Sequence, residues 1–207
     1  SQDHKRRHAA DRGPNTGGMG AISPLPQFKP DQVQAAQSLV DATLAGMHQD
    51  GLNGHGVMYI GLIFTKEGPK ILEYNMRFGD PETQVLLPQI ENDFYQLVSD
   101  LLDGQQPTLK LNGQAYACFV AVNPDYPRAN LKTVPVIVPT NWPIGTWLPA
   151  GVERTDNGWI SDAGRIFSVV AGAVTLPEAV AKAKHDLESI QGVLDYRTDI
   201  GFHALKG

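Results

Sequence analysis

The sequence predicts an α+β protein in two parts: a mostly antiparallel sheet with helices, followed by a smaller β-rich domain closed by one helix. Three observations support this class. Apolar residues recur at helical spacing in three segments, which begin near Pro30, Asn92 and Thr175. Two strand-like runs surround a short glycine-containing turn in the first half, and further strand-like runs separated by Pro, Gly and Asn clusters fill the second. We therefore expect domains at 1–108 and 109–207.

The first half is predicted to start with a loop and continue into a helix. Residues 1–28 are rich in Gly, Pro, Asp and Asn and have no sustained period, which is typical of a long functional or mobile loop. From Pro30 the apolar residues follow one helical face, and this amphipathic helix is expected to end near Gly51. That face carries Val33, Ala36, Val40, Leu44 and Met47.

A hairpin and two further helix starts are expected next. The runs VMYIGLIFT and KILEYNMR are joined by KEGP, which predicts two strands around a short glycine-containing turn. Asp80-Pro81-Glu82 resembles a helix start, because it offers an acidic cap and a proline in the first turn. A second amphipathic helix is predicted from about Asn92 to Leu102, and Gly104 ends it.

The second half is predicted to contain short strands and one capped helix. Its strand-like runs are AYACFVAV, VPVIVP and RIFSVVAG. Thr175 and Glu178 form a capping box ahead of a helix with a single apolar face. The tryptophans lie among β-type runs with prolines, which favours packing over base stacking. They are Trp142, Trp147 and Trp159.

Composition restricts the function classes. The 207 residues are 42% hydrophobic and 19% charged, with a net charge of −5 that argues against a general nucleic-acid binder. No apolar run has the roughly 20 residues of a membrane helix and no signal peptide is evident, so a cytoplasmic protein is expected. The single Cys118 excludes an internal disulfide and is expected to be buried. His4 and His8 are expected in a solvated basic terminus, not in a metal pair.

Polar and apolar side chains alternate in the run ILEYNMRFGDPETQ. Because alternate residues of a strand share a face, Glu73, Asn75 and Arg77 are expected to project together. A carboxylate and an amide oxygen suit Mg²⁺, which commonly takes one or two protein groups together with nucleotide phosphates. Arg77 adds a planar fork of donors for phosphate or carboxylate. The opposite face, expected to pack against the core, carries Leu72, Tyr74 and Met76.

This alternation has a simpler interpretation, in which Arg77 pairs with Glu73 on a solvated sheet face. The tripeptide pattern by itself favours that interpretation. A second segment, DRGPNTGGMGAISP, changes the balance, because its glycines allow backbone N–H groups to converge on an anion. It matches neither the P-loop nor the dinucleotide fingerprint. It is either a flexible turn or a loop that closes over a phosphate-bearing substrate.

Three stretches together resemble one enzyme family. QDHKR followed by GPNTGGMGAISP, the run YIGLIFTKEGPKILEYNMRFGDPETQVLLP, and YRTDIGFHAL closely resemble the glycinamide ribonucleotide synthetases, the phosphoribosylamine–glycine ligases of ATP-grasp type. The resemblance covers essentially the whole chain, with GPNTGGMG and NMRFGDPETQ as its most specific parts. It implies the C-terminal part of an ATP-grasp domain in 1–108. It also implies joining of glycine to 5-phosphoribosylamine with ATP, through a glycyl phosphate, in purine biosynthesis.

The resemblance also assigns roles to residues. By its implication Glu73 and Asn75 are ligands of Mg²⁺ or Mn²⁺, and Arg77 is a catalytic residue that meets the transferring phosphate or the substrate. Many ATP-grasp relatives carry an additional acidic metal ligand where this chain has Gly61, a position that the synthetases usually leave without one as well. A further set is implied in binding substrate or phosphate: Asn15, Thr16, Gly17, Gly18, Asp80 and Glu82.

A full family member is about twice as long, with a substrate domain and a nucleotide clamp ahead of these residues. We therefore expect a fragment without turnover, whose partners in the full-length enzyme are ATP, glycine and 5-phosphoribosylamine, with no nucleic acid or membrane. Asp125 to Arg128 replaces the family's GYPG motif, and His203 stands where arginine is common. The alternatives are another ATP-grasp ligase or carboxylase of the purine pathway and a non-catalytic remnant. The sequence does not indicate an oligomeric state.

Overall fold

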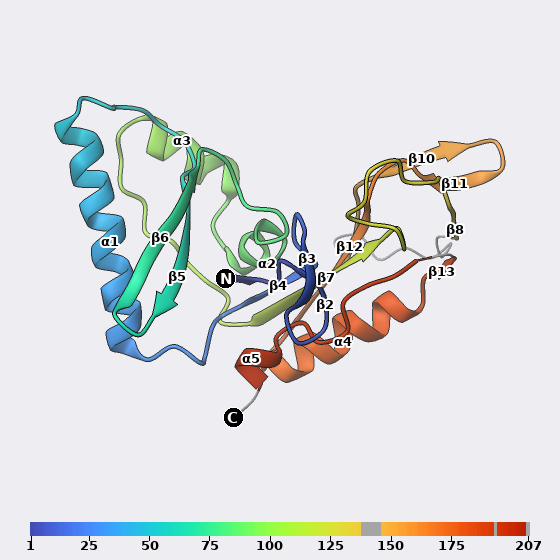
Figure 1. Ribbon diagram of the computed structural model, residues 1–207. Helices are drawn as coiled ribbons and strands as arrows, with labels where there is room; N and C mark the ends of the chain where they lie inside the picture. Colours follow the sequence, from blue (N-terminus) through green and yellow to red (C-terminus); the bar gives the residue numbers. More distant parts are fainter. Residues whose placement is uncertain (138–145, 193, 206–207) are drawn as a thin grey trace. The chain divides into compact units, whose positions relative to one another are not determined.

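The computed structural model describes residues 1–137, 146–192 and 194–205, which form two compact units (Figure 1). Each unit is assembled from stretches that are separated along the chain. Unit 1 consists of Ser1–Leu25, Asp80–Glu91 and Lys110–Gly207, and unit 2 of Pro26–Gly79 and Asn92–Leu109. The α+β class is confirmed. The units group residues by spatial contact, so the domain division at 108/109 stays a prediction.

Unit 1 is built on an antiparallel five-stranded sheet in the order β1-β4-β7-β12-β9. Its strands are β1 (Gln2–Asp3), β4 (Gly20–Ser23), β7 (Ala115–Val122), β12 (Arg165–Ala173) and β9 (Trp147–Pro149). The two longest strands, β7 and β12, pair along most of their length, with one irregularity between Arg165 and Phe167. Because β7 and β12 are almost entirely buried, they carry continuous apolar runs without polar alternation.

The expected loop over residues 1–28 is wrong in part, because this segment contains four short strands. Besides β1 and β4 it forms the two-stranded ribbon β2 (Arg6–His8) and β3 (Arg12–Asn15). All four residues of β4 are buried against β7. Strands of two to four residues are too short to show a period, which explains why a Gly- and Pro-rich sequence concealed them.

A second sheet in unit 1 has the order β10-β11-β8-β13. Its strands are β10 (Val152–Thr155), β11 (Gly158–Ser161), β8 (Pro135–Ile137) and β13 (Gln191–Gly192). The predicted strand VPVIVP is present up to Ile137, and the rest of that run lies outside the described residues, as does Trp142. Trp147 is buried as expected, and Trp159 packs half-buried against the core.

The hydrophobic core lies between the five-stranded sheet and α4 (Leu176–Glu188), which contacts both β7 and β12 (Figure 1). The predicted capping box is confirmed: Thr175 Oγ1 accepts from Glu178 N–H, and the Glu178 carboxylate accepts from Thr175 N–H. Cys118 is fully buried in this core, and burial raises the pKa of its thiol to about 12. The face of α4 that enters the core carries Leu176, Ala179, Ala183 and Leu187.

Unit 2 contains a hairpin and two helices. The predicted hairpin is β5 (Tyr59–Thr65) and β6 (Gly68–Asn75), and α1 (Pro30–Gln49) lies alongside β6 (Figure 1). The third element is α3 (Phe94–Leu102), and the carboxylate of its N-cap residue Asp93 accepts from Gln96 N–H. Both helices agree with their predicted ranges to within two residues.

The expected core face of the hairpin is wrong. Leu72, Tyr74 and Met76 are 65%, 51% and 69% exposed. Tyr74 does meet α1, since its hydroxyl lies 3.1 Å from Thr43 Oγ1, but α1 has no buried residue with which to complete a core. Among the described strands, β5 and β6 pair only with each other, and a single two-stranded ribbon cannot bury a face.

The predicted helix start at Asp80-Pro81-Glu82 is displaced. The helical turn α2 (Thr83–Leu86) follows these residues and continues into η1 (Leu87–Gln89), but its N-cap is Glu82 in helical conformation without a side-chain cap. Asp80 does not cap this turn, because its carboxylate is bound elsewhere. A last turn, α5 (Phe202–Leu205), ends the described chain, and no described helix is long and apolar enough to cross a membrane.

Candidate functional site

The predicted metal ligands lie near the end of β6, in unit 2. Glu73 pairs with Gly61 of β5, and Asn75 pairs with Tyr59. They are two residues apart in a regular part of the ladder, so they share one face of the hairpin. Glu73 is exposed and Asn75 half-buried. The structure thus places a carboxylate and an amide on one accessible strand face.

Gly61 leaves room for the Glu73 side chain. A Cβ at Gly61 would lie 3.0 Å from Glu73 Cγ and 3.6 Å from Glu73 Oε1. An acidic side chain at Gly61 would therefore crowd Glu73 and place a second negative charge beside it. Gly61 therefore shapes the space around a single carboxylate.

Arg77 follows β6 and is exposed. Its Nη1 donates a 2.9 Å hydrogen bond to the carbonyl of the adjacent Phe78, a contact that fixes the direction of the guanidinium near its own backbone. A bond of this kind leaves other donors of the fork for an anionic group.

The donor set of this face suits a metal held mainly by its substrate. Within the described residues, no group of three or more His, Cys, Asp or Glu side chains could hold a metal ion. One carboxylate and one amide oxygen can suffice for a divalent cation such as Mg²⁺ when phosphates and water complete its shell.

The glycine-rich segment belongs to unit 1, where Thr16 folds it into a tight turn. Both the backbone N–H and the hydroxyl of Thr16 donate to the carbonyl of Lys5, each at 2.8 Å. The same hydroxyl oxygen accepts from Gly18 N–H at 3.0 Å. Asn15 is the exposed last residue of β3, paired with Arg6. This turn is held by its own polar groups and is not a flexible linker.

Two residues to which the sequence analysis assigned no role hold Gly17 in place. Its N–H donates to Tyr126 Oη at 2.7 Å, and its carbonyl accepts from Arg165 Nη1 at 3.2 Å. Arg165 also forms a bidentate pair with Asp80, with both nitrogen–oxygen distances at 3.1 Å. A fork of this geometry fixes orientation better than a single contact. Arg165 therefore connects the glycine-rich segment to the start of the DPET stretch.

Gly18 is confined by the same stretch. Its φ is +120°, and a Cβ there would lie 2.4 Å from Pro81 Cδ and 2.8 Å from Asp3 Oδ1. Neither the backbone conformation nor the space admits another residue. Glu82 is 4% exposed. The predicted substrate-binding residues Gly17, Gly18, Asp80 and Glu82 therefore all belong to unit 1, and two of them, Gly18 and Glu82, are buried there.

A buried carboxylate accompanies them. The Asp3 side chain is 6% exposed, neither of its oxygens has a hydrogen-bond partner among the described residues, and Lys5 Nζ lies 3.6 Å away. Burial, reinforced by the charge of Glu82, raises the pKa of Asp3 to about 7, against the opposing effect of Lys5. Asp3 can therefore exchange a proton near neutral pH.

The expectation of a solvated terminus is wrong for His4, which is 2% exposed. Its Nε2 accepts from Gly201 N–H at 2.9 Å, so Nδ1 carries the proton and donates to Gly20 O at 3.2 Å. Burial, followed by the charge of Arg197, lowers the pKa of His4 to about 4. His4 is therefore a neutral structural residue. The polar composition of residues 1–8 gave no indication that His4 would be buried.

Arg197, from the stretch YRTDIG, is the largest fully buried side chain of the described chain. Its guanidinium donates to the carboxylates of Asp199 and Asp11 and to the carbonyl of Arg6. Asp11 in turn binds His203 at 2.8 Å. This cluster fastens the β2–β3 ribbon to the C-terminal segment, whereas the spacing of YRTDIG had indicated no chemistry.

Comparison with known families matches two models in the order expected along one chain. Residues 1–83 match the phosphoribosylglycinamide synthetase ATP-grasp (A) domain, and residues 116–203 match the C domain of the same synthetase. A phosphoribosylamine–glycine ligase of Streptococcus pneumoniae is 39% identical over all of this chain and 50% of its own length. One of Halalkalibacterium halodurans is 39% identical over 99% of this chain and 49% of its own. The chain thus spans about half the length of these relatives.

Solved structures give the same result. A phosphoribosylamine–glycine ligase from Thermotoga maritima matches 96% of this chain and 50% of its own, with 32% identity and a TM-score of 0.84. The biotin carboxylase domain of a Hydrogenobacter thermophilus 2-oxoglutarate carboxylase matches 84% of this chain and 39% of its own. At 16% identity and a TM-score of 0.57, this second likeness concerns the fold alone.

Proposed function

Because the chain belongs to the phosphoribosylglycinamide synthetase family, we propose that it is part of a ligase that joins glycine to 5-phosphoribosylamine at the expense of ATP. The observation that carries this proposal is the match of two successive domains of one synthetase, supported by 39% identity over the whole chain. It favours this ligase over other ATP-grasp enzymes, whose likeness here extends to the fold only.

The proposed reaction has two steps. A carboxylate oxygen of glycine attacks the γ-phosphorus of ATP, so that ADP leaves and glycyl phosphate forms. The amine of phosphoribosylamine then attacks the acyl carbon, which releases phosphate and a proton and leaves the amide product. The first step brings two anions together, so the site must supply positive charge and orientation more than a nucleophile of its own.

We assign Glu73 and Asn75 to the metal. Their shared face and the space opposite Gly61 support this role, since the two oxygens could bind Mg²⁺ or Mn²⁺ while ATP phosphates provide the remaining ligands. When bound, such an ion neutralises charge that develops on the phosphates. The chain's own contribution is to hold the two oxygens on one strand.

Arg77 is assigned to the transferring phosphate or the glycine carboxylate. Its position two residues beyond Asn75 supports this role, and so does a guanidinium that uses one nitrogen on Phe78 and keeps other donors. A fixed cation at this point would stabilise the charge of the transition state.

The substrate-binding role of the unit 1 residues rests on how firmly they are held. Thr16 and Gly17 form a turn that is braced by Tyr126 and Arg165, and Asp80 is fixed by the same arginine. We propose that Asn15, Gly18 and Glu82 belong to this binding surface, and that Arg165 and Tyr126 are positioning residues for it.

Calorimetric titration of MgATP into the chain tests the metal assignment. We expect weak binding that Glu73→Ala and Asn75→Ala each reduce at least about fivefold. Glu67→Ala is the matched control, because Glu67 lies in the turn of the same hairpin and its exposed carboxylate forms a salt bridge with Lys70. Binding that all three variants leave unchanged would refute the assignment, and no heat at millimolar nucleotide would make this chain a scaffold without a residual site.

A further inference from the structure

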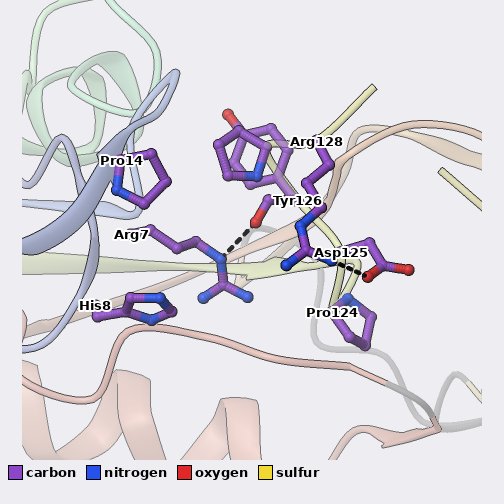
Figure 2. A pocket seen from close by; sticks show the side chains of 8 residues that line it. Arg7, His8, Pro14, Pro124, Asp125, Tyr126 and Arg128 are labelled. Atoms are coloured by element: carbon purple, nitrogen blue, oxygen red, sulfur yellow. Dashed lines mark hydrogen bonds and ion pairs between the residues drawn. The ribbon is translucent and has the colours of Figure 1, made fainter. Parts of the chain in front are cut away.

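Unit 1 contains a pocket of about 190 Å³, and of its lining residues the function proposed above uses only Tyr126 (Figure 2). Its walls come from β2, β3 and the turn that follows β7. Figure 2 shows the guanidinium of Arg7 beside this turn, with His8 and Pro14 on the ribbon side. The turn contributes Asp125, Tyr126 and Arg128, among others.

Arg7 is a buried cation with one donor group left over. Its side chain is 3% exposed, its Nε donates to Tyr126 O at 2.8 Å, and its Nη2 donates to Asp195 Oδ2 at 2.7 Å. Within the described residues its third nitrogen, Nη1, has no hydrogen-bond partner. A guanidinium that is fixed at two nitrogens presents the third with little further loss of entropy when a ligand binds.

Arg128 provides a second cation on a rigid turn. Asn123 organises this turn: its side-chain oxygen accepts from Asp125 N–H at 3.0 Å, and its carbonyl accepts from Tyr126 N–H at 2.9 Å. The Arg128 side chain is 81% exposed and lies 3.5 Å from the half-exposed Asp125 carboxylate. An exposed pair of this kind stabilises little, so the Arg128 guanidinium can turn to a stronger anion.

We propose that this pocket is a binding site for a phosphate monoester, held by Arg7 Nη1 and the fork of Arg128. Phosphate accepts several charge-assisted hydrogen bonds at once, which two guanidinium groups from opposite walls can supply. The one lining carboxylate, Asp125, has a flexible partner in Arg128, while Asp195 is already occupied by Arg7. This proposal does not depend on the ligase assignment.

The size of the pocket limits the ligand. A volume of about 190 Å³ is below the roughly 300–1,000 Å³ of pockets that hold drug-sized ligands and slightly above a cavity that accepts benzene. A nucleotide is therefore too large to be enclosed. A phosphate group, alone or on a sugar no larger than a pentose, fits.

The test is an NMR titration of the full 207-residue chain with inorganic phosphate and, in parallel, with ribose 5-phosphate, both in about 0.15 M NaCl. We expect saturable shifts of the backbone amide signals of His8, Asp125, Tyr126 and Arg128 at millimolar ligand. Tighter binding of ribose 5-phosphate would identify a phosphorylated sugar as the ligand, and equal binding would identify the phosphate group alone. Both results support the site, whereas linear, unsaturated shifts with both ligands overturn it.

Two variants make the test specific. Arg128→Gln removes an exposed cation without disturbing the core and should weaken binding at least about fivefold. Arg154→Gln, at an exposed arginine of β10 that does not line the pocket, is the matched control and should bind as the parent chain does. Equal affinity of the Arg128 variant and the parent chain would show that the anion binds elsewhere and would disprove the proposal.

Discussion

Single residues of unit 1 fix the glycine-rich segment by satisfying its backbone. Arg165 reaches Gly17 across 148 positions of sequence, and Tyr126 reaches it across 109. Gly18 fits against Pro81 because it lacks a side chain. The segment is therefore well fixed although its Gly- and Pro-rich composition is typical of flexible turns, since its polar groups are paired and Gly18 is enclosed.

Replacement of Gly18 by alanine should destabilise the protein by about 2–4 kcal/mol. The new Cβ would meet Pro81 Cδ and Asp3 Oδ1 in a backbone conformation that alanine rarely adopts. Gly104→Ala is the matched control, because Gly104 has φ +76° and no neighbour within 4 Å of a Cβ, so only the conformational cost of about 1 kcal/mol remains. Urea unfolding of both variants measures the difference, and equal losses would show that Gly18 is not sterically confined.

Asp3→Asn should stabilise the protein increasingly as the pH rises. The pKa of Asp3 is raised from 3.8 to about 7 on folding, so between these values the folded state binds more protons than the unfolded state. The parent chain therefore loses stability as the pH rises through this window, whereas asparagine has no proton to lose. The stability gained by the variant should be about 2 kcal/mol larger at pH 8 than at pH 5. Chemical unfolding at both pH values checks this, and a gain independent of pH would contradict the shifted pKa.

At the scale of elements, sequence periodicity predicted the helices and the hairpin whose formation depends on a local sequence pattern. The helices α1, α3 and α4 and the hairpin β5–β6 were all foreseen, because each has a full apolar period or a turn signal. Strands β1 to β4 were not predicted from the sequence. Strand β4 pairs with β7, which lies far along the chain, and the short strands β1, β2 and β3 pair with neighbours in the same segment. The predicted core face of β6 failed because alternation identifies a face but not what covers it.

The cluster of Arg197, Asp11 and Asp199 joins the β2–β3 ribbon to the C-terminal segment. Arg197→Met should cost about 3–5 kcal/mol, since it leaves Asp11, Asp199 and the Arg6 carbonyl without their shared donor. Thermal unfolding measures the loss. Arg154→Met is the control at an exposed arginine and should change stability by less than about 0.5 kcal/mol. If Arg197→Met also lowered the free energy of unfolding by less than about 0.5 kcal/mol, the cluster would not be needed for the stability of the ribbon.

The candidate site was predictable where its chemistry is local to the sequence. Glu73, Asn75 and Arg77 occur within five positions, so strand alternation sufficed to place the first two on one face. Arg165 and Tyr126 were not predictable, because each has an ordinary local context and acts on a segment more than 100 positions away. The roles of Arg165 and Tyr126 become evident only from their contacts with Gly17 in the folded structure, and residue spacing along the sequence does not indicate these contacts.

For the whole molecule, the two units differ in how they are stabilised. Every buried hydrophobic residue of the described chain belongs to unit 1, whereas the buried residues of unit 2 are glycines. The exposed apolar side chains of unit 2 include Leu72, Met76, Tyr95 and Leu102. Regular backbone hydrogen bonding without apolar burial contributes little net stability, so the units should not open with the same free energy.

Native-state hydrogen exchange should reveal this difference within one chain. Amides of α1 and of β5–β6 lie in elements without buried apolar side chains, so their exchange requires only local opening. Amides of β7 and β12 lie in the core and can exchange only when unit 1 unfolds. We expect protection at least about a hundredfold higher in β7 and β12, which corresponds to about 2.7 kcal/mol of opening free energy. Arg197→Met, if it weakens unit 1 as expected, should lower protection in β7 and β12 and leave that of β5–β6 unchanged. Equal protection throughout the parent chain would instead mean that both units unfold in a single cooperative step.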